Sequence, residues 1–270
     1  MLGILNIILA IALTIIYSVT NGIPLNFLGI LTILLAFILS FIIFFIVLFL
    51  PFVIVIYATE KTDHKSAFKH MFLKAYSRYI FKFFYRAKLI TTGKENLPKD
   101  NNFVVYANHI EYTDPIYILM EYKQPLAFIS KEPLFKFPVL KNLLRGIGCI
   151  PISPYADKSA LKTILLAIKQ VKEGQPMGVF PEGKRTYSND LIAFKPGAFR
   201  VAEKAKAAIS PVCIYNMHAL SKKLRIFPTK VYMHILPLIK YEEYKDLDSI
   251  GISNLVFEKI QEQMNKFKTS

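Results

Sequence analysis

The sequence predicts an α/β domain built on a mixed, largely parallel sheet flanked by helices, preceded by an N-terminal membrane helical hairpin. Two observations lead to this prediction. The first 59 residues contain no Asp, Glu, Lys, Arg or His, so the whole formal charge of +15 falls on the residues that follow. In that second part, short β-rich runs alternate with helical stretches, a pattern typical of parallel or mixed sheets.

The uncharged part consists of two apolar runs, Leu2–Tyr17 and Leu25–Tyr57, with turn-forming residues between them. A helix needs roughly 20 apolar residues to cross a bilayer core, so the second run is long enough and the first is marginal. We expect residues 1–59 to form a membrane-inserted hairpin that either spans the bilayer or enters one leaflet. A cleaved signal peptide is the weaker alternative, because no basic segment precedes the first run.

Basic residues directly follow the second apolar run, and positively charged flanks of membrane segments remain in the cytoplasm. We therefore expect an integral protein of the cell membrane with residues 60–270 on the cytoplasmic side. Cys149 and Cys213 lie in apolar, strand-like contexts and agree with a reducing compartment. No C-x-x-C motif is present and the histidines are scattered, which gives a metal site no support. The basic residues of the flank are Lys61, Lys65, Lys69, Lys74, Arg78, Lys82, Arg86 and Lys88.

Residues 65–88, approximately, are predicted to form an amphipathic helix at the membrane interface. Its apolar side chains recur at helical spacing and its cations recur at steps of four. The apolar side can pack on the domain, the cations can meet anionic lipid headgroups, or both can hold. The apolar set is Phe72, Tyr76, Tyr79, Ile80 and Phe83, and the cations are Lys74, Arg78, Lys82 and Arg86.

The rest of the chain is predicted to form one domain of alternating strands and helices, without an internal repeat. The expected strands are Phe103–Ala107, Ala127–Ser130, Gly148–Ile152, Met177–Phe180, Ile209–Tyr215 and Val231–Ile239. The expected helices are Pro115–Tyr122, Pro133–Arg145, Ser159–Glu173, Gly197–Ala207 and Ser253–Phe267.

A first polar motif, residues 108–115, directly follows the strand Phe103–Ala107. Ligand sites of α/β sheets collect at such strand ends. His109 is suited to act as a base near neutral pH, provided that a carboxylate orients its ring. Asp114 can do so if the loop folds back, and Glu111 is a second candidate. The alternative for Asp114, which precedes Pro115, is a purely structural N-cap.

A second polar motif, residues 180–186, directly follows the strand Met177–Phe180. Gly183 would allow a backbone N–H to approach a ligand closely. Arg185 can bind a phosphate with two donors, and Lys184 adds a point charge. The alternative is a solvated charged turn.

The two motifs together, Asn-His-x-x-x-x-Asp-Pro and Phe-Pro-Glu-Gly-x-Arg-Thr, resemble those of the glycerolipid acyltransferase family. The resemblance is closest to 1-acylglycerol-3-phosphate (lysophosphatidic acid) acyltransferases and covers about Gly93 to Tyr215. Three further stretches are similar to blocks of that family, namely Ser130-Lys131-Glu132-Pro133, Phe194-Lys195-Pro196-Gly197-Ala198 and Ile209-Ser210-Pro211-Val212.

The resemblance implies an acyltransferase domain at 60–270 with the family's fold. It implies that His109 deprotonates the hydroxyl of a lysophospholipid acceptor and that Asp114 orients His109. Glu182 and Gly183 would then shape the acceptor pocket, with Lys184 beside them, and Arg185 with Lys131 would hold the acceptor phosphate. The acyl donor would be acyl-CoA or acyl carrier protein. We expect membrane lipids as partners, and no nucleic acid, metal or bound cofactor.

The sequence departs from the family in one place. The family often has Gly-x-Ile-Phe-Ile-Asp-Arg, with the Arg assigned to phosphate, whereas this chain has Gly148-Cys149-Ile150-Pro151-Ile152-Ser153-Pro154. Lys131, Arg185 and Lys158 are candidates to compensate. The departure keeps open another acceptor, such as glycerol 3-phosphate or a different lysophospholipid. A non-catalytic lipid-binding scaffold is the alternative from outside the enzymes.

Overall fold

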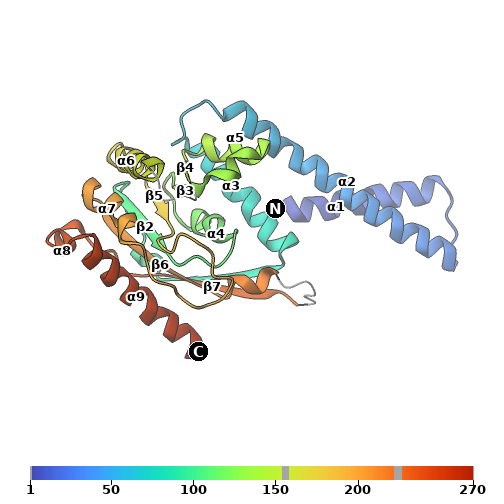
Figure 1. The fold of residues 1–270 in the computed structure, drawn as a ribbon. Coiled ribbons are helices and arrows are strands. Elements are labelled where there is room, and N and C mark those ends of the chain that lie inside the picture. Colours follow the sequence, from blue (N-terminus) through green and yellow to red (C-terminus); the bar gives the residue numbers. More distant parts are fainter. Residues whose placement is uncertain (1, 154–157, 222–226, 270) are drawn as a thin grey trace. The chain divides into compact units, whose positions relative to one another are not determined.

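The computed structural model describes residues 2–153, 158–221 and 227–269. The chain divides into two compact units, an N-terminal unit, Met1–Ala58, and a C-terminal unit, Thr59–Ser270 (Figure 1). The boundary coincides with the end of the uncharged part of the sequence.

The N-terminal unit consists of two helices, α1 (Leu2–Thr20) and α2 (Phe27–Thr59), which form at the two apolar runs. The amide of Asn6 donates to the carbonyl of Phe41 at 3.5 Å and so links the two helices. Among the described helices, α2 is long and apolar enough to cross a membrane, with a mean hydropathy of 3.4 in its most apolar window. The apolar part of α1 is shorter.

The C-terminal unit contains a seven-stranded sheet in the order β1-β7-β6-β2-β5-β3-β4. Every neighbouring pair is parallel except β6 and β7, so the prediction of a mixed, largely parallel sheet is confirmed. The strands are β1 (Ala87–Thr92), β2 (Phe103–Ala107), β3 (Ala127–Lys131), β4 (Ile150–Ile152), β5 (Met177–Val179), β6 (Ala208–Tyr215) and β7 (Thr229–Ile235).

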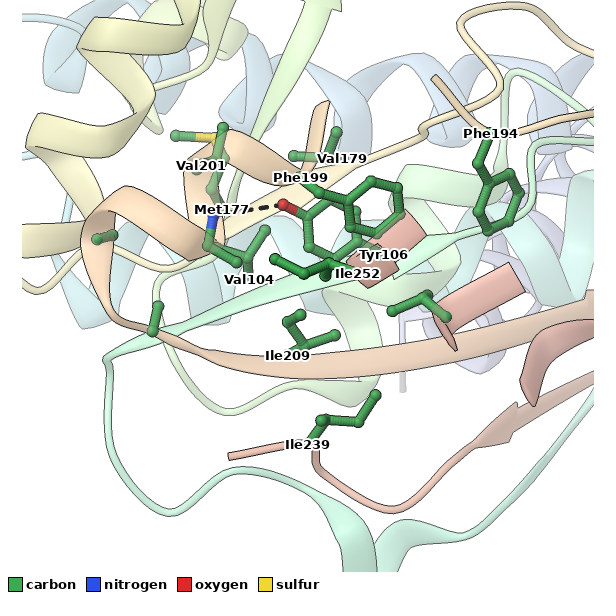
Figure 2. Packing of buried hydrophobic residues seen from close by; sticks show 14 of the residues in the cluster. Val104, Tyr106, Met177, Val179, Phe194, Phe199, Val201, Ile209, Ile239 and Ile252 are labelled. Atoms are coloured by element: carbon green, nitrogen blue, oxygen red, sulfur yellow. Dashed lines mark hydrogen bonds between the residues drawn. The ribbon is translucent and has the colours of Figure 1, made fainter. Parts of the chain in front are cut away.

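Two hydrophobic cores lie on opposite faces of this sheet. One lies under α6 (Lys158–Lys172), α7 (Arg200–Ala205) and α9 (Ser249–Thr269). Figure 2 shows its centre, where the ring of Tyr106 stacks on Phe199 with centroids 4.3 Å apart. The buried hydroxyl of Tyr106 donates to the carbonyl of Ala198 and accepts from the amide of Ala202. The other core lies under α4 (Asp114–Glu121).

Several predicted boundaries change in the structure. β1 was not predicted, and the amphipathic helix was expected to take in its first two residues, 87 and 88. The predicted helix Pro133–Arg145 is divided into a 3-10 turn, Glu132–Lys136, and α5 (Pro138–Gly146). The break is at Phe137, whose backbone is extended. Phe137 precedes Pro138, and the proline ring sterically disfavours helical φ and ψ angles at the residue before it. The short helix α8 (Tyr241–Tyr244) was also not predicted.

The amphipathic helix itself is α3 (Ala67–Tyr79), extended by one π-helical turn to Phe84. Its predicted apolar side packs inward, with Tyr76 and Tyr79 buried. Of the four cations that could have met lipid headgroups, Lys74 is instead buried and donates to the carbonyls of Tyr122 and Lys123. Burial, with a smaller contribution from the charge of Arg78, lowers the pKa of Lys74 to about 8.

Three cations of α3, the buried Lys69 and Lys74 and the exposed Arg78, hold the C-terminal ends of two neighbouring helices. Lys74 and Arg78 donate to carbonyls at the end of α4, where Arg78 reaches Met120 at 3.3 Å. Lys69, also buried, donates at 2.9 Å to the carbonyl of Gly146, the last residue of α5. Helix C-termini leave carbonyls without partners and carry partial negative charge, so cations are favourable there. These side chains therefore dock α3 onto the domain.

Candidate active site

The two polar motifs lie side by side at one edge of the sheet. β2 and β5 are adjacent and parallel, so the loops that follow them leave the same edge. The amide of Thr186 donates to the carbonyl of His109 at 2.9 Å, and the amide of Tyr187 donates to the carbonyl of Ile110 at 3.2 Å. Backbone hydrogen bonds thus join the loop of His109 to the loop of Glu182 and Arg185.

His109 and Asp114 form a direct hydrogen bond, with 2.8 Å between Nδ1 and Oδ2. The same Oδ2 accepts from the amides of Ile110 at 2.6 Å and Glu111 at 2.8 Å. An ionised carboxylate oxygen can only accept hydrogen bonds, so we assign the proton of the imidazole to Nδ1. The lone pair of Nε2 is then the basic site of the ring.

Asp114 is completely buried. Burial raises the pKa of its carboxyl, while the His109 ring and the two backbone amides oppose that rise. The N-cap position of α4 belongs to Thr113, and the Asp114 carboxylate turns back into the preceding loop instead. The alternative that Asp114 serves as a simple N-cap is therefore wrong. Glu111 is not the partner of His109 either, because its carboxylate accepts from the hydroxyl of Ser221 at 2.8 Å.

Stacking fixes the plane of the His109 ring. The ring lies on Phe180 with centroids 4.1 Å apart and an angle of 22° between the planes. Phe180 in turn stacks on Phe128 of β3, with centroids 6.1 Å apart. The side chain of His109 remains 16% exposed, which leaves an approach for a substrate to an otherwise enclosed ring.

Glu182 is buried behind the histidine, and neither carboxylate oxygen has a hydrogen-bond partner of ordinary geometry among the described residues. Burial raises the pKa of this carboxyl to about 8, and the negative charge of Asp114 adds to the rise. The nearby backbone amides of His109 and Ile192 and the cation of Lys184 act in the opposite direction. The raised pKa moves the titration of Glu182 out of the acidic range and toward neutral pH.

Gly183 has a positive φ of 70°, which favours glycine. A Cβ at this position would lie 2.7 Å from Nζ of Lys195, so the Lys195 side chain occupies the space over the glycine. The amide of Lys195 also donates to the carbonyl of Pro181 at 2.9 Å. The sequence indicated Gly183 but missed Lys195 as a cation of the same turn, although the Phe194-Lys195 block contained it.

Arg185 is held by aromatic side chains from both loops. Its guanidinium carbon lies 3.3 Å from the ring centroid of Tyr112 and 5.5 Å from that of Tyr187. Both tyrosines are more than half exposed. Tyr112 was not among the predicted site residues. Its position between His109 and Asp114 is the feature of the sequence that could have indicated it. Lys184 is exposed beside Arg185.

The remaining predicted residues lie around this centre. Lys131 is exposed at the last position of β3, the next strand after β5, where it pairs in register with Ile152. Pro154 lies outside the described residues, as does the side chain of Lys158. No separate role was predicted for Asn108. Its side-chain amide exchanges two hydrogen bonds with the backbone of Ile214 and so extends the pairing of β2 with β6. This bridge fixes the residue that precedes His109.

The fold and this site define an α/β enzyme with a histidine–carboxylate pair and adjacent cations at a sheet edge. A family model described as Acyltransferase matches residues 88–215. A 1-acyl-sn-glycerol-3-phosphate acyltransferase of Borreliella burgdorferi is 31% identical over 183 residues, which cover 67% of this chain and 73% of that protein. A Bacillus subtilis protein of the same name is 32% identical over 122 residues, 44% of this chain and 58% of that protein.

Among solved structures, the 1-acyl-sn-glycerophosphate (LPA) acyltransferase PlsC of Thermotoga maritima matches with a TM-score of 0.64 and 26% identity. The match covers 74% of this chain and 80% of that chain. The chain belongs to the acyltransferase family represented by these proteins, and it is an acyltransferase.

Proposed function

We propose that the protein transfers a fatty acyl group to the free hydroxyl of 1-acylglycerol 3-phosphate and so forms phosphatidic acid for phospholipid biosynthesis. The donor is the thioester of acyl-CoA or acyl carrier protein. The observation that carries the proposal is the His109–Asp114 pair, whose basic Nε2 lies at the sheet edge that also carries Arg185. The names of the relatives support the choice of acceptor.

In this reaction His109 Nε2 accepts the proton of the acceptor hydroxyl while the hydroxyl oxygen attacks the thioester carbonyl. Asp114 stabilises the imidazolium that forms, because its Oδ2 already contacts Nδ1. When the tetrahedral intermediate collapses, the thiolate leaves and takes the proton from His109. The products are an ester and a free thiol, and no acyl-enzyme is formed.

The cations of the site suit an acceptor that carries phosphate. Arg185 offers a planar set of N–H donors that can bind two phosphate oxygens, and stacking on Tyr112 limits its orientations. Lys131, Lys184 and Lys195 add positive charge around it. Glu182 and Gly183 lie in the same turn and shape the acceptor side of the site.

An assay of the detergent-solubilised, full-length protein tests the proposal. The acceptors are 1-acylglycerol 3-phosphate, glycerol 3-phosphate and lysophosphatidylcholine, each with acyl-CoA and with acyl carrier protein as donor. We expect the highest kcat/KM with 1-acylglycerol 3-phosphate. Preference for another acceptor would assign the protein to the same chemistry on a different substrate, which the missing Arg near Ser153 keeps open. Failure with all acceptors would contradict the enzymatic role.

The membrane arrangement belongs to the same proposal. Residues 1–59 insert as a hairpin, and residues 60–270 form an acyltransferase domain on the cytoplasmic side of the cell membrane. The apolar composition of α2 supports insertion, and the basic residues that follow it support this orientation. Release of the full-length chain by alkaline carbonate would contradict insertion. Cleavage between Lys61 and Lys94 by protease added to intact cells would contradict the orientation.

A further inference from the structure

The segment between β3 and β4 exposes two large apolar side chains, Phe137 and Val139. No residue of its 3-10 turn, Glu132–Lys136, is buried, and the buried residues of α5 are Asn142 and Gly146. A surface helix of a soluble domain normally buries its apolar stripe and exposes its polar residues. In this segment Phe135 and Leu144 pack against the core, but Phe137 is 62% exposed and Val139 38% exposed. The half-buried apolar residues of the same segment are Leu134, Phe135, Leu140, Leu143 and Leu144.

Cations surround these apolar side chains. Lys136 is exposed at the end of the 3-10 turn, Arg145 is exposed near the end of α5, and Lys141 is half-buried between them, while Glu132 is the acidic residue of the segment. Aromatic and aliphatic side chains flanked by Lys and Arg are typical of segments that lie in the headgroup layer of a bilayer. The charge is complementary to anionic lipid.

This segment leaves the sheet at the edge that carries the catalytic pair. It begins directly after Lys131, the last residue of β3, and β3 contributes Phe128 to the stack formed by Phe180 and His109. The far end of α5 is held by Lys69 of α3, which donates to the carbonyl of Gly146. The segment is thus anchored at both ends, and its outer side remains available.

We propose that residues 132–146, the α5 surface, lie against an anionic bilayer with Phe137 inserted among the lipids. The inference goes beyond the proposed reaction, because it assigns a membrane-contact surface to the C-terminal unit itself. It also replaces part of the interfacial role predicted for α3, whose Lys69 and Lys74 are used inside the domain. A lipid acceptor then enters the site from the bilayer beside Lys131.

A second exposed apolar region lies in the groove between α6, α7 and the start of α9, with Leu161, Leu165 and Ile250 on its walls. The same groove contains Glu203 and Asp248 as well as Arg200 and Lys204. Its mixed charge is not complementary to an anionic surface, so Ile250 provides a matched control with an exposed fraction of 56%.

The protein contains no tryptophan, which allows a single fluorescent probe to be placed at either surface. Full-length Phe137→Trp and Ile250→Trp would be reconstituted into vesicles of phosphatidylcholine and phosphatidylglycerol, with and without brominated acyl chains. We expect Phe137→Trp to emit at shorter wavelength and to be quenched by brominated lipid but not by iodide. Ile250→Trp should be quenched by iodide but not by brominated lipid. Equal quenching of the two variants by brominated lipid would overturn the proposal.

A kinetic comparison uses Phe137→Asp and Ile250→Asp. Phe137→Asp should raise KM several-fold for a long-chain acceptor presented in vesicles and leave KM for a short-chain, water-soluble acceptor unchanged. Ile250→Asp should change neither. An equal loss with both acceptors would assign Phe137 to the site instead of the membrane. Dimers that protect Phe137→Trp from iodide in detergent would assign the surface to a second copy of the chain and contradict the proposal. The fluorescence measurement needs no turnover, so it can fail independently of the proposed reaction.

Discussion

The guanidinium of Arg185 lies over the ring of Tyr112, 3.3 Å from its centroid, so a residue of the first motif holds the main cation of the second. The hydrogen bonds from the amides of Thr186 and Tyr187 to the carbonyls of His109 and Ile110 join the same two loops. The base and the phosphate-binding group of the proposed reaction are therefore fixed relative to each other before a substrate binds. Such pre-organisation lowers the entropy that substrate binding must remove.

Arg185→Ala should raise KM for the phosphate-bearing acceptor by about 10- to 100-fold, because a hydrogen bond to a charged group contributes about 1.5–3 kcal/mol. KM for the acyl donor should change much less. Tyr112→Phe should keep KM near the wild-type value, since the stacking ring remains, whereas Tyr112→Ala should raise KM for the acceptor. Steady-state kinetics with each substrate varied in turn measure both effects. Equal changes in KM for donor and acceptor would contradict the assignment of Arg185.

Asp114→Asn should lower kcat by about 100-fold or more, because the neutral amide no longer stabilises the imidazolium and can present the wrong group to Nδ1. It should also lower the melting temperature, since Oδ2 accepts two backbone amides in a buried loop. Both quantities would be measured on the same preparation. A lower melting temperature with unchanged kcat would reduce Asp114 to a structural residue.

Lys74→Ala should destabilise the C-terminal unit by about 1–3 kcal/mol, because it leaves buried carbonyls at the end of α4 without a donor. The matched control is Lys82→Ala on the following turn. Lys82 is exposed beside Phe83, and its loss should change stability by less than about 0.5 kcal/mol. Thermal melting of both variants tests this difference. Equal melting temperatures would show that Lys74 is not a structural cation.

The pKa of Glu182, raised from 4.5 to about 8, predicts a specific dependence of stability on pH. Between these two values the folded state binds a proton that the unfolded state has released, so stability should fall as pH rises through this window. A single group contributes a slope of at most about 1.4 kcal/mol per pH unit. Glu182→Gln lacks the titration, so its melting temperature should fall less over the same window. If the melting temperatures of wild type and variant fall equally over this pH window, Glu182 is already ionised in the folded state.

Much of the site could be predicted because the sheet is largely parallel. Two polar motifs that each follow a buried strand must meet at one edge if their strands are neighbours, and β2 and β5 are neighbours. Within each motif, the residue types led to the roles predicted for His109, Gly183 and Arg185, and these roles stay predictions. The hydrogen bond from His109 to Asp114 required the loop to fold back, and the sequence could offer this only as one of two alternatives.

Contacts between residues far apart in the sequence could not be predicted. The cations of α3 recur at steps of four, which defines a helix face but does not show whether that face meets lipid or the ends of α4 and α5. The same pattern extended the predicted helix into residues 87–88, where pairing with β7 produces β1 instead. The approach of Lys195 to Gly183 likewise depends on how residues 184–194 return to the turn.

The most direct test of the account is the rate of acyl transfer by full-length His109→Ala, measured with 1-acylglycerol 3-phosphate and a saturating acyl thioester. Loss of a general base lowers the rate by about 100- to 10,000-fold, so we expect kcat to fall by at least about 100-fold. Circular dichroism and the melting temperature should remain close to wild type, because the histidine side chain is partly exposed and the Asp114 carboxylate keeps its two backbone donors. A variant that retains more than half of the wild-type kcat would contradict the assignment of His109 as the base.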